Sequence, residues 1–303
     1  MRQPQVARLA DGRRLHLQEG PIDLVIEAFG VKDAVAAAYG AATRRFTGLL
    51  DELVQELPLL RTQAGGSGTR LTGVVARAMH AAVAPFAEES FITPMAAVAG
   101  AVADEILQAM RRAAPLARAY VNNSGDIALH LQTGESFMLG LVDRPDRPSL
   151  FARALIAAHD PSRGIATSGW RGRSFSLGIA DAVTVLAATA AQADAAATVV
   201  ANAVDLPGHP AIVRAPACSI KPDNDLGDIP VTRAVGLLAP HAIGEAIARG
   251  FARARALRDR GLIHAAAIHL QGGTRILVSG EVEAPRLSLA PSLTQAAPVF
   301  AHA

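Results

Sequence analysis

The sequence is poor in cysteine and in aromatic residues. Its 303 residues include one cysteine, Cys218, one tryptophan and two tyrosines, and aromatic side chains make up 4% of the chain. A single cysteine excludes an internal disulfide and is typical of a reducing compartment, so we expect a cytoplasmic protein. Half of the residues are nevertheless hydrophobic. We therefore expect a core of alanine and aliphatic side chains, in which helices approach one another closely.

Long apolar runs and a strong charge imbalance are missing too. No window of 18 or more residues is apolar and free of charge, which predicts no transmembrane helix, and the first residues lack the apolar stretch of a signal peptide. The formal net charge is only +2. Arginines gather over 249–260, near the end of an expected helix, where cations complement the helix dipole. A solvated helix face is favoured there, so we expect neither a membrane nor a nucleic acid as partner.

Several common catalytic motifs are absent as well. The chain has no P-loop, no Gly-x-Gly-x-x-Gly after a strand, no Gly-x-Ser-x-Gly elbow and no Cys/His cluster with metal-ligand spacing. P-loop enzymes, Rossmann dehydrogenases and simple hydrolases are therefore disfavoured.

The hydrophobic pattern predicts alternating helical and extended segments. Helices are expected over 31–57, 71–83, 93–112, 189–204 and 239–260, with Thr93 and Thr189 as N-caps. Strands are expected over 119–131, 136–143, 176–188 and 263–283. Three similar stretches, starting at Leu15, Leu129 and Ile268, each place a His-Leu-Gln run at the end of a strand before a glycine turn. The mixed order and the hairpins predict an α+β fold with mixed or antiparallel sheets and packed Ala-rich helices. We expect a single domain over 1–285 and a C-terminal tail over 286–303.

The stretch from Gly164 to Trp170 is the most informative part of the sequence. Its small residues, Gly-Ile-Ala-Thr-Ser-Gly-Trp, suggest a tight turn with free backbone N–H groups, which can cradle an anion. Asp194 follows, with Thr198 one helical turn later on the same face, and oxygen ligands of this kind suit Mg²⁺. The alternative interpretation is an ordinary turn followed by the first turns of a helix.

Four segments, in this order and spacing, resemble the ApbE superfamily. They are Phe91–Met95, Val121–Ile127 (Val-Asn-Asn-Ser-Gly-Asp-Ile), Gly164–Trp170 and Ala193–Thr198. The founding enzymes of this superfamily are FAD:protein FMN transferases, and the chain looks most like its cytosolic bacterial and archaeal branch. The resemblance implies an ApbE-like α+β fold, FAD or FMN as ligand, and Mg²⁺.

The resemblance also implies roles for individual residues. Asn122, Asn123 and Asp126 would orient the ligand, and Asp194 with Thr198 would bind Mg²⁺. The phosphates would lie near the turn formed by Ala166, Thr167, Ser168 and Gly169. No residue is assigned to catalysis.

One departure from the family pattern leaves alternatives open. The founding enzymes carry an Asp-Pro-x-Thr-Gly segment after the Thr-Ser-Gly turn, whereas here Arg171, Arg173, Ser174 and Ser176 follow it. Arginine binds phosphate or carboxylate with two parallel hydrogen bonds, so Arg173 with Ser174 could hold a small anionic ligand. Three functions remain: an Mg²⁺-dependent transferase, a non-catalytic binding or assembly protein, and an enzyme acting on a small anionic metabolite. A homodimer is compatible with the sequence.

Overall fold

A long antiparallel sheet forms the frame of the molecule. The computed structural model describes residues 3–65, 71–142, 150–278, 286–289 and 299–301. Nine strands are hydrogen-bonded in the order β1-β2-β3-β4-β5-β8-β9-β12-β13, and each neighbouring pair is antiparallel. The strands are β1 (Gln5–Arg8), β2 (Leu15–Glu19), β3 (Ile22–Phe29), β4 (Arg118–Asn123), β5 (Asp126–Leu131), β8 (Gly164–Ser168), β9 (Ala182–Ala187), β12 (Ala265–Leu270) and β13 (Gly273–Leu277).

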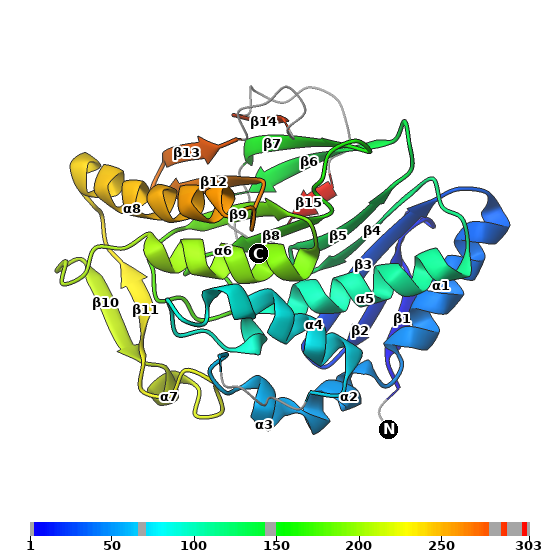
Figure 1. The fold of residues 1–303 in the computed structure, drawn as a ribbon, viewed down its shortest axis with the longest axis horizontal. Coiled ribbons are helices and arrows are strands. Elements are labelled where there is room, and N and C mark those ends of the chain that lie inside the picture. Colours follow the sequence, from blue (N-terminus) through cyan, green and yellow to red (C-terminus); the bar gives the residue numbers. More distant parts are fainter. Residues whose placement is uncertain (1–2, 66–70, 143–149, 279–285, 290–298, 302–303) are drawn as a thin grey trace.

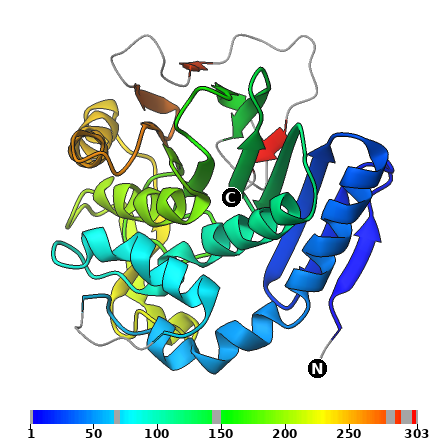
Figure 2. The same cartoon turned by 45° about the vertical axis from the view of Figure 1, so that its right-hand side comes forward.

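Helices cover one face of this sheet, as Figures 1 and 2 show. The helices that pack on it are α1 (Lys32–Phe46), α5 (Val98–Ala113), α6 (Ala190–Ala203) and α8 (Pro240–Asp259). The other helices are α2 (Leu49–Gln55), α3 (Leu57–Leu60), α4 (Val74–Val83) and α7 (Ala217–Ile220). None of the helices in the described part of the chain is long and apolar enough to cross a membrane.

A second, four-stranded sheet packs on the opposite face. Its order is β14-β7-β6-β15, with β14 (Arg286–Leu289), β7 (Leu150–Ala157), β6 (Ser136–Val142) and β15 (Val299–Ala301). Side chains such as Ile127 and Ile165 of the long sheet and Phe137 and Ile156 of the small one form a shared core. A separate hairpin joins β10 (Ile212–Pro216) to β11 (Pro230–Val235). The result is a three-layered α+β fold, as expected. Parts of the expected tail pair with β6 and β7, while the division at residue 285 stays a prediction.

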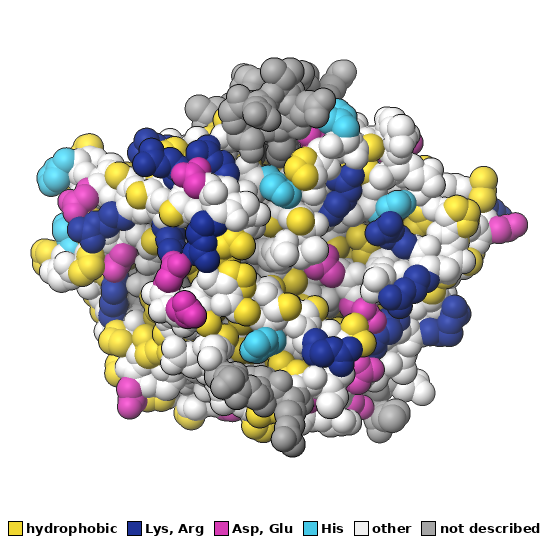
Figure 3. Space-filling view, viewed as in Figure 1, with side chains coloured by type: hydrophobic (Ala, Val, Ile, Leu, Met, Phe, Trp, Pro, Cys, Tyr) yellow, Lys and Arg dark blue, Asp and Glu magenta, His cyan; other side chains and the backbone are white. Residues whose placement is uncertain are grey.

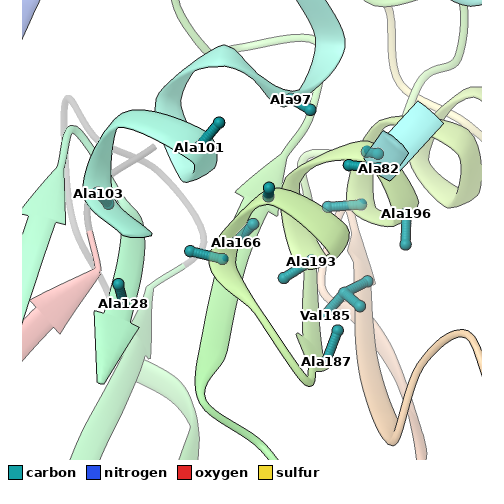
Figure 4. Close-up of a cluster of buried hydrophobic side chains, with 14 of the residues drawn as sticks. Ala82, Ala97, Ala101, Ala103, Ala128, Ala166, Val185, Ala187, Ala193 and Ala196 are labelled. Carbon is teal, nitrogen blue, oxygen red and sulfur yellow. The ribbon is translucent and has the colours of Figure 1, made fainter. Parts of the chain in front are cut away.

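The central helix α6 is packed through alanine, as Figure 4 shows for Ala193 and Ala196. Nearly every residue of this helix that faces its neighbours is a buried alanine or valine. Glycines on the adjoining elements allow the close approach. A Cβ atom on Gly100 of α5 would lie 2.2 Å from the carbonyl oxygen of Ala190, and one on Gly164 of β8 would lie 2.0 Å from the carbonyl oxygen of Thr189. Helix α6 therefore touches the backbone of both neighbours.

Several local predictions are confirmed. Thr189 caps α6, since its hydroxyl accepts a hydrogen bond from the backbone N–H of Gln192 at 3.2 Å. The first and third His-Leu-Gln stretches end the hairpin strands β2 and β12, whereas the second ends β5, which is followed by a strand of the other sheet.

Three local predictions are wrong. The expected turn at Gly164–Gly169 is strand β8, paired along its whole length with β9, so most of its backbone groups serve the sheet. The expected strand over 176–188 is confined to Ala182–Ala187. The single helix over 31–57 is broken, because Gly48 adopts a left-handed conformation with φ 83°.

The packing of α5 against α6 predicts opposite outcomes for two glycine substitutions in helices. Gly100→Ala should lower the free energy of unfolding by about 1–3 kcal/mol, because the new methyl group meets backbone atoms that cannot move aside. Gly244→Ala in α8 is the matched control, since no atom lies within 4 Å of its added Cβ. That change should raise the free energy by up to about 1 kcal/mol through helix propensity. Denaturant unfolding of both variants tests the pair, and equal effects would contradict the packing argument.

Candidate functional site

The predicted site residues gather where β4, β5 and β8 meet the first turns of α5 and the middle of α6. Asn123 ends β4 and pairs with Asp126, the first residue of β5. The turn between them uses Ser124, with φ 55°, and a glycine. The buried Asn123 amide donates a hydrogen bond to the carbonyl oxygen of Ala99, 3.1 Å away in the first turn of α5. The Asn-Gly-Asp turn is thus fixed to the helix layer.

Strand alternation divides the predicted ligand-binding residues between two faces. The Thr167 hydroxyl lies 2.9 Å from the hydroxyl of Thr184 and faces the small sheet. Its neighbours Ala166 and Ser168 face the helices, because successive side chains of a strand point to opposite sides. Asn122 pairs with residues of β3 and β5 whose side chains face the small sheet, so it lies on that face too. Its side-chain oxygen accepts a hydrogen bond from the N–H of Gly125 at 2.8 Å. The Thr167 side chain therefore cannot contact a ligand on the helix side of the sheet, where only its backbone groups are available.

Two carboxyl groups, from Asp126 and Asp194, meet on the helix side. Asp194 in α6 accepts a hydrogen bond from the N–H of Gly100 at 3.0 Å, and Asp126 accepts one from the N–H of Thr167. Burial raises the pKa of Asp194 to about 7, and hydrogen bonds from the N–H groups of Gly100 and Ala99 only partly oppose the effect. Burial, and then the charge of Asp194, raise the pKa of Asp126 well above its usual range. The Oδ1 atom of Asp126 is buried without a hydrogen-bond partner among the described residues.

Asp104 belongs to the same neighbourhood, and sequence analysis missed it. Its two carboxylate oxygens accept hydrogen bonds from the N–H groups of Ala190 and Ala191, at 3.0 and 2.9 Å. Together with the Thr189 cap, Asp104 satisfies the first N–H groups of α6, so the start of this helix is closed to an anion. Burial raises the pKa of Asp104 to about 6, against the effect of these hydrogen bonds. No local pattern in the sequence signals a contact between α5 and the start of α6.

The segment after β8 is held by the buried side chain of Asp181. Its Oδ1 atom accepts hydrogen bonds from Arg171 Nε at 2.8 Å and Trp170 Nε1 at 3.2 Å, and the Arg171 guanidinium lies 4.3 Å from the centre of the Trp170 ring. Gly169 is also explained by packing, because a Cβ there would lie 2.4 Å from the carbonyl oxygen of Asp181. Arg171 therefore already has a carboxylate partner, and the sequence analysis missed Asp181 altogether.

Arg173 lies near the turn that carries Asn123 and Asp126. It is exposed and donates hydrogen bonds to the Ser124 hydroxyl at 2.7 Å and to the carbonyl oxygen of Pro21 at 3.2 Å. Both partners are neutral, so the positive charge of Arg173 is not compensated there. Ser174 is exposed beside it. The structure thus brings Arg173 to the same end of the sheet as the Asp126–Asp194 pair.

The donor set at this pair fits Mg²⁺ better than a softer metal. No group of three or more His, Cys, Asp or Glu side chains that could hold a metal ion is found within the described ranges. Asp126 and Asp194 offer two carboxylates, and Thr198 adds a hydroxyl one helical turn after Asp194. Mg²⁺ commonly binds proteins through one or two carboxylates and keeps water and ligand phosphate as its other partners. The unpartnered oxygen of Asp126 is one that a cation would satisfy.

Comparison with known proteins identifies the family to which this chain belongs. The family model described as AbpE bacteria matches residues 6–279. The chain belongs to this family. It is therefore a member of the ApbE-like superfamily that the sequence motifs indicated.

Individual relatives match only part of this chain, at 36% and 39% sequence identity for two of them. A UPF0280 protein of Methanopyrus kandleri is 39% identical over 128 residues, which cover 42% of this chain and 48% of the relative. One from Methanoculleus marisnigri is 36% identical over 170 residues, 56% of this chain and 62% of the relative. The chain thus spans about half the length of the first curated relatives it matches.

Two solved structures are similar over most of the chain. The apo flavinyl transferase ApbE of Pseudomonas stutzeri shares 12% identity over 95% of both chains, with a TM-score of 0.48. A mutant of the flavin transferase ApbE from Vibrio cholerae shares 13% identity over 88% of this chain and 98% of that one, with a TM-score of 0.47.

The raised pKa values of Asp104 and Asp194 predict how stability depends on pH without metal. An unfolded Asp has a pKa of about 3.9, so between about pH 4 and pH 7 the folded state binds more protons than the unfolded chain. The free energy of unfolding should therefore fall as the pH rises from 4 to 7 in the presence of a chelator. Asp194→Asn keeps a hydrogen-bond acceptor and should make this fall smaller. The exposed Asp259→Asn should leave it unchanged, and urea unfolding at several pH values measures all three proteins.

Proposed function

We propose that the protein binds an anionic ligand of the flavin or nucleotide type together with Mg²⁺ between α6 and the ends of β5 and β8. The observation that carries this proposal is the pair of carboxyl groups of Asp126 and Asp194, which are half-buried, interact with each other electrostatically and have no basic side chain bonded to them within the described part of the chain. Burying a charge is costly unless it is paired, so these groups hold protons when alone and favour a cation when one is present.

Each residue has a defined task in this proposal. Asp126, Asp194 and the Thr198 hydroxyl hold Mg²⁺, which when bound neutralises negative charge on phosphoryl oxygens. Asn123 fixes the turn before Asp126 through its bond to the Ala99 carbonyl. Ser168 lies on the same face of the sheet and is a candidate hydrogen-bond donor to the ligand. Arg173 supplies the positive charge for the anionic part of the ligand at the edge of the site.

Two features bear on whether the ligand is also transformed. The founding enzymes of the superfamily transfer FMN from FAD, which supports a flavin nucleotide as the ligand. The chain after β8, however, is tied to Asp181 and leads directly to β9 without the Asp-Pro-x-Thr-Gly segment. This departure favours a second candidate, binding without transfer. AMP release from FAD distinguishes them, because transfer of FMN to a hydroxyl group releases AMP and binding alone does not.

Melting experiments test the metal and ligand together. FAD with Mg²⁺ should raise the melting temperature more than FAD with a chelator does. At a hundredfold excess of ligand over Kd, the stabilisation relative to the ligand-free protein is about 2.7 kcal/mol. Asp194→Asn should abolish the Mg²⁺-dependent part, because it removes a charged ligand of the ion but keeps an acceptor for the Gly100 N–H. The exposed Asp259→Asn is the control and should keep the whole effect. A Mg²⁺-dependent shift of unchanged size in the Asp194→Asn protein would refute the metal site.

Arg173 should contribute to affinity rather than to stability. Arg173→Ala should weaken FAD binding about tenfold, the effect of losing one charge-assisted contact, while the ligand-free protein melts as before. Arg112→Ala, in the last turn of α5 away from the site, is the matched control. Isothermal titration of both variants gives the comparison, and equal affinities would exclude Arg173 from the site.

A further inference from the structure

A cavity lies at the opposite end of β3 and β4 from the candidate site. Its volume is about 370 Å³, and it is bordered by the end of β1, the end of β3 and the first turn of α1. Pockets that bind small molecules begin at about 300 Å³. Figure 3 shows basic side chains at this right-hand end of the molecule. We call it the α1 cavity and define it by Arg8, Arg13, Glu27, Phe29 and Lys32, which are among its lining residues.

Cations outnumber acids in the wall of the α1 cavity. Arg8, Arg13 and Lys32 line it, and the buried Glu27 is the one carboxylate among its lining residues. The Glu27 carboxylate lies 3.5 Å from Arg13 Nε, accepts a hydrogen bond from the Tyr120 hydroxyl at 3.3 Å and also interacts electrostatically with Arg14. Two of the three positive charges therefore face the cavity without a compensating acid from its wall.

The remaining contacts of these cations are with neutral groups. Arg8 donates a hydrogen bond to the carbonyl oxygen of Arg13 at 3.1 Å and lies 4.2 Å from the centre of the Tyr39 ring. Lys32 is exposed, and it forms no ion pair with any residue that the structure describes. The carboxylate of Asp11, close by in sequence, is already bound by the Arg14 side chain and by the N–H groups of Arg13 and Arg14. A cleft lined mainly by one sign of charge attracts ions of the other sign.

The other walls of the α1 cavity suit a ligand with both a charged and an apolar part. Ala28, Val35 and Ala36 provide an apolar surface. The Phe29 ring itself packs on the small-sheet side, 4.3 Å from the Arg118 guanidinium and in edge contact with Phe137. The N-cap residue Val31 has no side-chain acceptor for the first N–H groups of α1, which favours an anion there, although the carboxylate of Asp33 in the same turn partly offsets this field.

We propose that the α1 cavity binds the phosphate group of a small metabolite. The guanidinium groups of Arg8 and Arg13 and the ammonium group of Lys32 bind the phosphate oxygens, and Val35 and Ala36 contact the apolar part of the molecule. This site shares no residue with the Asp126–Asp194 site and needs no metal, so it is a second binding function of the chain.

Calorimetric titration with inorganic pyrophosphate in a chelating buffer tests this site alone. The unmodified protein should bind one pyrophosphate, and the double variant Arg13→Ala/Lys32→Ala should raise the Kd at least tenfold. Arg13 and Lys32 are largely exposed, but Arg13 pairs with the buried Glu27, so the titrations are run well below the melting temperature of the variant, which is measured first. The double variant Arg44→Ala/Arg112→Ala removes the same charge from exposed positions outside the cavity and should leave the Kd unchanged.

The outcomes separate this inference from the proposed flavin site. Asp194→Asn should bind pyrophosphate like the parent protein in chelator, whether or not it binds FAD. Absence of saturable binding to the parent protein would overturn the inference. Equal loss of affinity in the two double variants would also overturn it, because binding would then follow net charge rather than the α1 cavity.

Discussion

The contact between the first turns of α5 and α6 is the constraint on which both the packing and the candidate site depend. Gly100 lets the two backbones touch, and its N–H donates to Asp194 one turn into α6. Asp104, one turn further along α5, caps the start of α6. The same two turns of α5 therefore fix the position of α6 and the orientation of its carboxylate. A shift of either helix would disturb the core and the acidic pair together.

The three acidic residues differ in how fully their charge is compensated. Asp104 has two N–H donors in good geometry, and Asp194 has the N–H groups at the start of α5. Asp126 has one N–H donor and an oxygen without a hydrogen-bond partner in the described structure. An isolated buried charge is unfavourable. The two hydrogen bonds of Asp104 compensate its charge and hold α6 in place, whereas the less compensated charges of Asp126 and Asp194 are the ones that a cation would stabilise. The distinction rests on burial and partners rather than on residue type.

The sequence could predict most of the elements and the family, but not how the predicted site residues are arranged, and their function as a site stays a prediction. Local signals were sufficient for the Thr189 cap and for the helical spacing of Asp194 and Thr198. The order of the motifs was sufficient for the family. The Gly164–Ser168 strand was mistaken for a turn, because small residues suit a turn and also suit a strand pressed against a helix. Asp104 bonds to residues 86 and 87 positions away, and Asp181 to residues 10, 11 and 90 positions away, beyond the reach of helix or turn patterns, so no local pattern could have identified either residue.

Asp181 has a consequence for how the molecule can be observed. It binds the indole N–H of Trp170, and this is the single tryptophan of the chain. The tryptophan fluorescence of the folded protein therefore comes from one indole, which lies just after the strand that ends in Ser168 and is stacked on the guanidinium of Arg171. Changes in that emission report on the packing of this one segment without an added label. Because aromatic residues are rare, this single indole gives the protein a built-in optical probe of the segment that follows β8.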